Sequence, residues 1–230
     1  MSNGEGKNPW ERLAKLWATV GKLLLDGNRT PEEVCEVLQA IVSERRNSVL
    51  TPILATWATF YRDYLGMEAD LSSVVIPPHR PGYDRLIVIP QGLTMNAVIT
   101  TMKKHFSVYL YTNDLDRDVP TNERDSKSGS YAVRVRDWVE ADEENKNLSA
   151  NQVKQLGLTT LTLLERLVYE FKYYSETKSH LDLSNVSLCS GSRSSGGGVP
   201  GVFWDDGRLG VGWCRTGRSD GRIRARAAVV

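Results

Sequence analysis

The sequence predicts an α+β protein in which an N-terminal helical region precedes a domain that mixes helices with a mainly antiparallel sheet. Apolar side chains recur at helical spacing over residues 9–66, whereas short alternating segments and helices succeed one another after residue 83. The segment between them is rich in proline, which interrupts helices. We therefore expect a helical region over residues 1–70, a boundary near residues 68–83 and a second domain over residues 83–230.

The composition is that of an ordinary globular chain, with 40% hydrophobic and 25% charged residues. The 29 basic residues nearly balance the 28 acidic ones, so net charge favours neither nucleic acid nor an anionic membrane as a partner. No apolar run approaches the roughly 18 residues of a membrane-spanning helix, and the first residues lack the pattern of a secretory signal. We expect no membrane partner and, by default, a cytoplasmic location, with surface display as the open alternative.

Three helices are expected in the N-terminal region. Pro9 stands at the first position of a helix that runs to about Leu25. The stretch Thr30-Pro31-Glu32-Glu33 has capping-box spacing, and Thr51-Pro52 begins a third helix that ends at Gly66. We interpret the apolar stripes of these helices as core contacts and leave open that the helices mediate homo-oligomerisation or docking. The first stripe comprises Leu13, Leu16, Trp17, Val20, Leu23 and Leu24.

The middle of the chain alternates predicted strands and helices. The strands are Arg85–Ile89, Val108–Tyr111 and Ser130–Val139, and the helices are Leu93–Lys104 and Thr162–Glu176. The polar run 112–129 is expected to be an exposed loop, and Glu140–Glu144 a solvated acidic stretch. The longer helix should pack on a sheet with its apolar side and carry Glu165, Arg166 and Glu170 on the other.

No metal site or cofactor is expected. Asp114, Asp116 and Asp118 imitate the start of a calcium-binding loop, but Val119 occupies the position where that loop needs glycine. The three histidines are distant from one another in the sequence and from any acid pair at ligand spacing. The three cysteines form no CxxC pair, so neither a zinc site nor a disulfide scaffold is predicted.

The last 44 residues differ in composition from the rest of the chain. They hold ten of the 19 glycines and seven arginines, but no lysine, glutamate, glutamine or methionine. Those four types number 32 in residues 1–186, so 44 average residues would hold about seven or eight of them. A turn-rich sheet accounts for the glycines but not for the complete absence of four residue types.

Within this tail, residues 202–213 predict a β-hairpin that turns at Asp206-Gly207. Because side chains alternate along a strand, the hairpin should have a buried face and a displayed face. The buried face comprises Val202, Trp204, Leu209, Val211 and Trp213. The displayed face comprises Gly201, Phe203, Asp205, Gly210, Gly212 and Cys214, a set that packing alone does not explain. Arg222–Val230 is expected to close the sheet as another alternating strand.

Several segments resemble the variable proteins of diversity-generating retroelements over roughly residues 83–230. The segments are Asn185–Arg193 (NVSLCSGSR), Val199–Trp204 (V-P-x-x-x-W), Val211–Trp213 (V-x-W) and the closing Arg222–Val230. Ser130–Gln152 and Thr162–Asp182 are similar to the strand and helix that precede the variable region in that family. The resemblance implies a C-type-lectin-like fold for the C-terminal domain, with a variable region at about residues 190–220.

The resemblance also implies a cause for the missing residue types. Retroelement mutagenesis in this family substitutes template adenines, so an asparagine codon AAC becomes any NNC codon. Such codons encode no Lys, Glu, Gln, Met or Trp. The tail lacks the first four types, and its two tryptophans, Trp204 and Trp213, occupy framework positions.

The candidate site is therefore a ligand-binding face and not a catalytic centre. Its predicted residues are Ser194, Ser195, Gly198, Gly201, Phe203, Asp205, Asp206, Arg208, Gly210, Gly212, Cys214, Arg215, Gly217, Arg218 and Asp220, supported by the framework residues Trp204, Trp213, Arg193 and Cys189. Phe203 is expected to be an apolar anchor on a small basic surface, with Arg208, Arg215 and Arg218 as donors to carboxylates or phosphates. We expect an unidentified protein ligand with an anionic epitope.

Two other functions are considered. Formylglycine-generating oxidases have a related fold, and Cys189 and Cys214 would have to supply their chemistry, but Cys189 lies among apolar neighbours in a predicted strand. A nucleic-acid-binding tail would use its seven arginines and stack bases on Phe203, Trp204 and Trp213, but two of these rings are expected in the core. Calcium-dependent sugar binding is disfavoured because only Trp204-Asp205-Asp206 approximates its motif.

Overall fold

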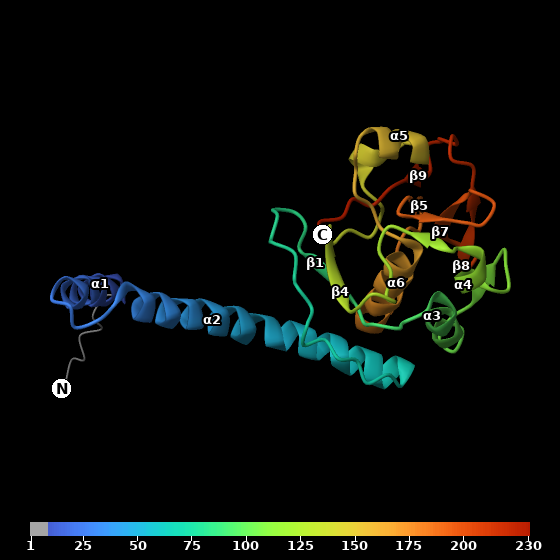
Figure 1. Cartoon of the computed structure of the whole chain (residues 1–230). Helices are drawn as coiled ribbons and strands as arrows, with labels where there is room; N and C mark the ends of the chain where they lie inside the picture. Colours follow the sequence, from blue (N-terminus) through green and yellow to red (C-terminus); the bar gives the residue numbers. More distant parts are fainter. Residues whose placement is uncertain (1–8) are drawn as a thin grey trace, which may run out of the picture. The chain divides into compact units, whose positions relative to one another are not determined.

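The computed structural model describes residues 9–230 and divides into two compact units between Ile53 and Leu54 (Figure 1). This division precedes the boundary expected at residues 68–83. Trp57, Phe60 and Tyr61 are buried in the core of the second unit, which therefore begins before the proline-rich segment. Residues 1–8 of the expected helical region lie outside the described residues.

Two helices form the N-terminal part. Helix α1 spans Pro9–Leu25, as predicted, and α2 spans Pro31–Phe60. The Thr30 N–H donates to Glu33 Oε2 (3.1 Å) and the Glu33 N–H donates to Thr30 Oγ1 (3.2 Å), which confirms the capping box.

The prediction of separate second and third helices is wrong. Helix α2 continues through Pro52 and is followed directly by the π-helix η1 (Tyr61–Leu65). A proline inside a helix removes one hydrogen bond and costs about 3 kcal/mol, but burial of Trp57 and Phe60 in the core stabilises the turns that follow Pro52. The helix therefore continues, and Gly66 ends η1 in the left-handed conformation, at φ 63°.

The apolar stripe of α1 is not buried. Leu13, Leu16 and Trp17 are 43%, 57% and 52% exposed, so the interpretation of this stripe as core is wrong. The stripe lines a groove of about 650 Å³ together with Val34 and Leu38 of α2. Two helices alone cannot cover an apolar stripe on all sides, so part of it stays exposed.

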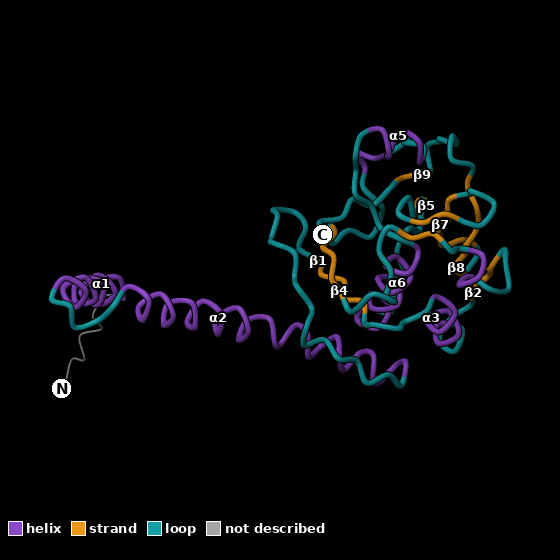
Figure 2. The backbone as a smooth tube through the Cα atoms, viewed as in Figure 1, coloured by secondary structure: helices purple, strands orange, loops and turns teal. Residues whose placement is uncertain are grey.

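The second unit is built on three sheets and is of the α+β class, as predicted (Figure 2). The largest sheet has the order β2-β8-β7-β5-β9, with β2 Val108–Leu110, β8 Arg208–Cys214, β7 Val199–Asp205, β5 Val186–Leu188 and β9 Ile223–Arg224. Strand β7 is antiparallel to both neighbours, whereas β2 and β9 run parallel to β8 and β5. The two small antiparallel sheets pair β1 (Arg85–Ile89) with β4 (Tyr131–Val135) and β3 (Thr121–Asn122) with β6 (Ser192–Arg193).

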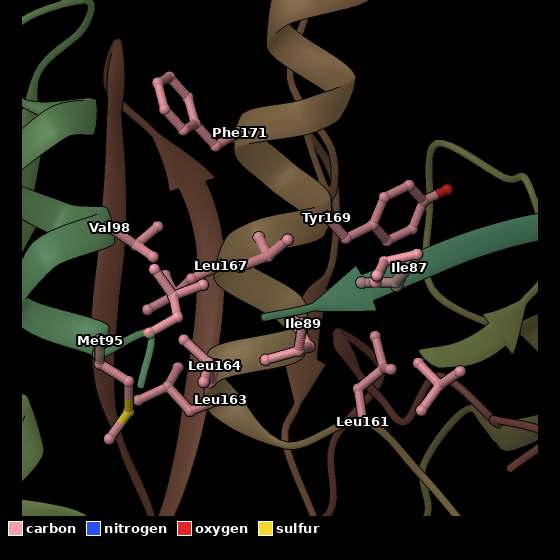
Figure 3. Close-up of a cluster of buried hydrophobic side chains, with 14 of the residues drawn as sticks. Ile87, Ile89, Met95, Val98, Leu161, Leu163, Leu164, Leu167, Tyr169 and Phe171 are labelled. Atoms are coloured by element: carbon pink, nitrogen blue, oxygen red, sulfur yellow. The ribbon is translucent and has the colours of Figure 1, made fainter. Parts of the chain in front are cut away.

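The helices of this unit are α3 (Met95–Met102), α4 (Leu115–Asp118), α5 (Ala150–Gln155), α6 (Leu163–Thr177) and the 3-10 helix η2 (Glu143–Asn145). Helix α6 contacts both β1 and β7, which confirms its packing on a sheet. Figure 3 shows Leu163, Leu167 and Phe171 of α6 among side chains of α3 and β1, including Val98 and Ile89. The same cluster includes Val202, Leu209 and Val211, so α6 and the large sheet share one core.

The charged side of α6 is buried as well. Glu165, Arg166 and Glu170 are each 0% exposed. Arg166 pairs with Glu170 (2.9 Å) and with Asp182 (2.8 Å). Buried charges need such partners because the interior cannot solvate them. An ionic network therefore joins α6 to the segment that precedes β5.

Asp182 is the centre of this network. Its carboxylate accepts from Arg166, from Arg226 (2.7 Å), from the Ser187 hydroxyl and from the Ala141 N–H (2.9 Å). Burial raises its pKa, but the two guanidinium groups and the hydrogen bonds more than offset this, so the pKa lies below its ordinary value.

Two segments expected to be solvent-exposed contribute to the interior. The run 112–129 contains α4 and β3, with Leu115 and Val119 buried, because its apolar residues face α3. In the expected acidic stretch 140–144, Asp142 is 1% exposed and accepts from Arg136 and from the Ala227 N–H. Burial raises the pKa of Asp142.

The three aspartates that imitate a calcium loop bind the chain itself. Asp114 caps α4, and Asp116 accepts from the first N–H groups of α3. Hydrogen bonds from Arg117 and Thr112 lower the pKa of Asp118 to about 2. Within residues 9–230 as described, no helix is long and apolar enough to cross a membrane.

Candidate functional site

The hairpin β7–β8 turns at Asp206-Gly207, as predicted. Both residues have positive φ, 49° for Asp206 and 71° for Gly207. This is the backbone of a two-residue type I′ turn, which matches the twist of antiparallel strands and favours Asp-Gly. The turn fixes the register Asp205↔Arg208, Phe203↔Gly210 and Gly201↔Gly212.

The register confirms which residues of the hairpin share a face. Val202, Leu209 and Val211 are 0–1% exposed and belong to the main core, against which Trp204 and Trp213 pack while partly buried. Of the residues predicted to be displayed on the opposite face, Asp205 is exposed and Phe203 is half-buried, whereas Gly201, Gly210, Gly212 and Cys214 are buried. The exposed candidates of the tail, most of them in the turn and loops beside the strands, are Ser195, Asp205, Asp206, Arg208, Arg215, Gly217 and Arg218.

Aromatic rings pack directly on two glycines of the displayed face. A Cβ at Gly210 would lie 2.3 Å from the ring of Phe203, and a Cβ at Gly212 would lie 3.0 Å from the ring of Tyr111. The rings therefore rest directly on the backbone of β8. We expected that packing would not explain the residues of the displayed face. This expectation is wrong at Gly210 and Gly212, where a larger side chain would collide with a ring.

Tyr109 and Tyr111 belong to the site but were not predicted from the sequence. Strand β2 is parallel to β8, with Tyr109 opposite Gly210, so both tyrosines share the displayed face. They are 45% and 60% exposed, and their rings make an edge contact at 5.1 Å. Their alternate spacing in a predicted strand was a detectable signal, but the pairing of β2 with a strand 100 residues later was not.

A depression of about 620 Å³ lies on this face. It brings together seven predicted candidates, namely Gly201, Phe203, Asp205, Gly212, Cys214, Arg218 and Asp220, with Tyr111, Val186, Trp213, Gly221, Arg222 and Ile223. Gly198, Arg215 and Cys214 line a separate depression of about 300 Å³. Ser194, Ser195, Asp206, Arg208, Gly210 and Gly217 line neither of these two.

Cys214 lies on the predicted side of the sheet but is not displayed. It is 8% exposed and packs with Ala150, Leu188, Val199 and Ile223 in a second apolar cluster, because α5 and β9 cover that end of the sheet. Burial raises the pKa of its thiol.

The side chains of the predicted framework residues Trp204, Cys189 and Arg193 contact the interior or the backbone of the domain. The ring of Trp204 stacks on His180 at 3.4 Å between centroids, and His180 Nδ1 lies 2.9 Å from Glu170. Cys189 is 1% exposed, and burial raises its pKa to about 12. Arg193 donates to two backbone carbonyl oxygens at 2.7 Å.

Three of the seven arginines of the tail bind other groups of the domain and are not available to a ligand. Arg193 is bound as above, Arg224 pairs with Glu143, and Arg226 is 2% exposed and paired with Asp182. These side chains stabilise the scaffold.

The remaining charges of the face are nearly balanced. The predicted site contains Arg208, Arg215 and Arg218 but also three aspartates, and Arg218 is already paired with Asp220 (2.9 Å). The guanidinium of Arg208 lies over the ring of Tyr109 at 5.0 Å. The expectation of a basic surface is therefore wrong.

No family model, curated protein or solved structure matches this chain.

Proposed function

We propose that the second unit is a ligand-binding domain whose displayed face is diversified by a diversity-generating retroelement on a C-type-lectin-like scaffold. The contrast between the buried framework side chains Val202, Leu209 and Val211 and the exposed candidate residues around them carries the proposal. A rigid scaffold that fixes the positions of exchangeable side chains is suited to changing ligands without changing the fold. The partner in this proposal is a protein, recognised through a face of nearly balanced charge.

The composition of the tail supports diversification. The displayed positions hold serine, glycine, phenylalanine, aspartate, arginine and cysteine, all of which NNC codons encode. The types that such codons exclude, including tryptophan, are absent from the displayed set, whereas Trp204 and Trp213 pack against the core.

The two other functions are less well supported. An oxidase needs an accessible thiolate, whereas Cys189 and Cys214 are buried and their pKa values are raised. A nucleic-acid-binding tail needs free cations, whereas Arg193, Arg224 and Arg226 are bound within the scaffold.

A library tests the proposal. We expect that simultaneous NNC randomisation of Ser195, Asp205, Arg208, Arg215 and Arg218 leaves most members folded, with melting temperatures within about 5 °C of the parent, because these side chains are exposed. Selection of the same library on immobilised lysozyme and on serum albumin should yield different binders. Thermal scans of individual members and binding assays on the selected ones provide the measurements.

A matched library at Val202, Trp204, Leu209, Val211 and Trp213 is the control. Most of its members should fail to fold, because these side chains pack in or against the core. Equal loss of folding in both libraries, or the absence of any binder from the first, would contradict the proposal.

A further inference from the structure

We propose that the depression on the displayed face holds one neutral aromatic side chain with a polar end, of the tyrosine type, contributed by the protein ligand. This inference rests on the proposed function for its partner, but its chemistry comes from the floor, walls and rim of the depression alone.

The floor is made of apolar side chains that lie over two glycines. Gly201 and Gly212 are directly paired on adjacent strands. A Cβ at Gly201 would lie 3.0 Å from Val186 Cγ1 and 3.4 Å from Cys214 Sγ, so these side chains cover Gly201, as the ring of Tyr111 covers Gly212. The floor is thus apolar, with Val186, Cys214 and Ile223 contributing to the lining. Apolar surfaces suit the face of an aromatic ring.

Two aromatic rings form the walls. Phe203 rests on Gly210, and Tyr111 rests on Gly212 with its edge against Tyr109. Because these contacts hold both rings in place, an incoming ring loses little free energy in ordering its site. Aromatic pairs gain more than area burial alone when their rings meet offset or edge-to-face.

The charges at the rim cancel. Arg218 donates from Nε (3.1 Å) and Nη2 (2.9 Å) to Asp220 Oδ2, and Asp220 Oδ1 accepts from the backbone N–H groups of Arg222 and Ile223. Asp205 and Arg222 add one charge of each sign. A charged guest of either sign would meet both signs at this rim, so it would gain no net attraction to offset the hydration that it loses.

The same rim suits a hydroxyl group. Asp220 already accepts four hydrogen bonds, but the Arg218 guanidinium, 57% exposed, has further N–H groups, and Asp205 in the same lining is exposed and accepts no hydrogen bond within the described residues, so the rim presents both a donor and an acceptor. A phenol hydroxyl can use both, whereas a phenyl ring uses neither. The volume of about 620 Å³ lies within the range of roughly 300–1,000 Å³ that is typical of ligand pockets.

The experiment uses the full chain and four small probes. We expect N-acetyl-L-tyrosinamide to shift the backbone amide NMR signals of Gly201 and Gly212, with a dissociation constant on the order of 1 mM. N-acetyl-L-phenylalaninamide should bind about 5-fold more weakly, because it lacks one hydrogen bond. N-acetyl-L-argininamide and the α-amide of N-acetyl-L-aspartic acid should bind at least about 10-fold more weakly, because each brings an uncompensated charge.

A pair of variants at equally exposed apolar side chains locates the guest. Tyr111→Ala removes a wall and should weaken N-acetyl-L-tyrosinamide at least about 10-fold, whereas Leu156→Ala, 61% exposed and outside the lining, should change it less than about 2-fold. Both side chains are largely exposed, so both variants should fold.

Three results would overturn the inference: no shift at Gly201 and Gly212 with 20 mM N-acetyl-L-tyrosinamide (about 20-fold above the expected dissociation constant), a charged probe that binds equally well, or equal effects of the two variants. These results are distinguishable from failure of the proposed function, because the probes need neither the natural ligand nor sequence diversity. The probe experiment can fail while the library of exposed positions still folds and yields binders. The library can likewise fail while the probes bind in the depression.

Discussion

Replacement of Asp182 by alanine is expected to lower the free energy of unfolding by about 3–5 kcal/mol. The carboxylate is 0% exposed and pairs with Arg166 and Arg226, which are 0% and 2% exposed. Its removal leaves two buried guanidinium groups short of a counter-charge. Chemical denaturation of the parent and of Asp182→Ala gives the difference directly.

Asp63→Ala is the matched control, because Asp63 also pairs with an arginine, Arg62, but at the surface. Its loss should cost about 1 kcal/mol or less. A similar cost for both variants would contradict the assignment of Asp182 as the centre of the network.

The same variant has an expected pH dependence. The pKa of Asp182 is lowered in the folded state, so its stabilising contribution is present above the unfolded value of about 3.9 and is lost as the pH falls through the folded pKa. Asp182→Ala should therefore lose less stability than the parent on acidification below about pH 4.

The second large effect is expected at the hairpin. Trp204→Ala should lower the free energy of unfolding by about 3 kcal/mol, because the indole stacks on His180 and packs against the core. The neighbouring Phe203→Ala, on the displayed face, should cost no more than about 1 kcal/mol. Equilibrium denaturation of the two variants measures both values.

Equal costs for these neighbouring aromatic residues would contradict the two-face account of the hairpin. A costly Phe203→Ala would mean that its contact with Gly210 is part of the folding core and not of the displayed surface.

Much of the second unit could be predicted from local pattern. The turn at Asp206-Gly207, the two faces of β7–β8 and the packing of α6 all depend on spacing that is visible in the sequence. The predictions failed where the outcome depended on partners distant in the chain. Asp142 is polar and looks solvated, but Arg136 and the Ala227 N–H allow it to be buried.

The candidate site shows the same limit. Alternation assigned Phe203 and Gly212 to one face, but only the pairing of β2 with β8 places Tyr111 beside them. Cys214 was assigned to the correct side of the sheet, yet α5 covers it, and no local pattern indicates which end of a face another element will cover. The surface was predicted to be basic from Arg208, Arg215 and Arg218, but the pairing of Arg218 with Asp220 was not visible in the sequence.

The central claim is that the displayed face is diversified, and the source genome tests it most directly. The account predicts a near-identical template repeat beside a reverse transcriptase gene, differing from the coding region only at template adenines. The differences should fall in codons for exposed residues such as Asp205 and Arg215, and none in those for Val202, Leu209 and Val211. Absence of such a repeat, or differences at other bases or in the buried codons, would contradict the account.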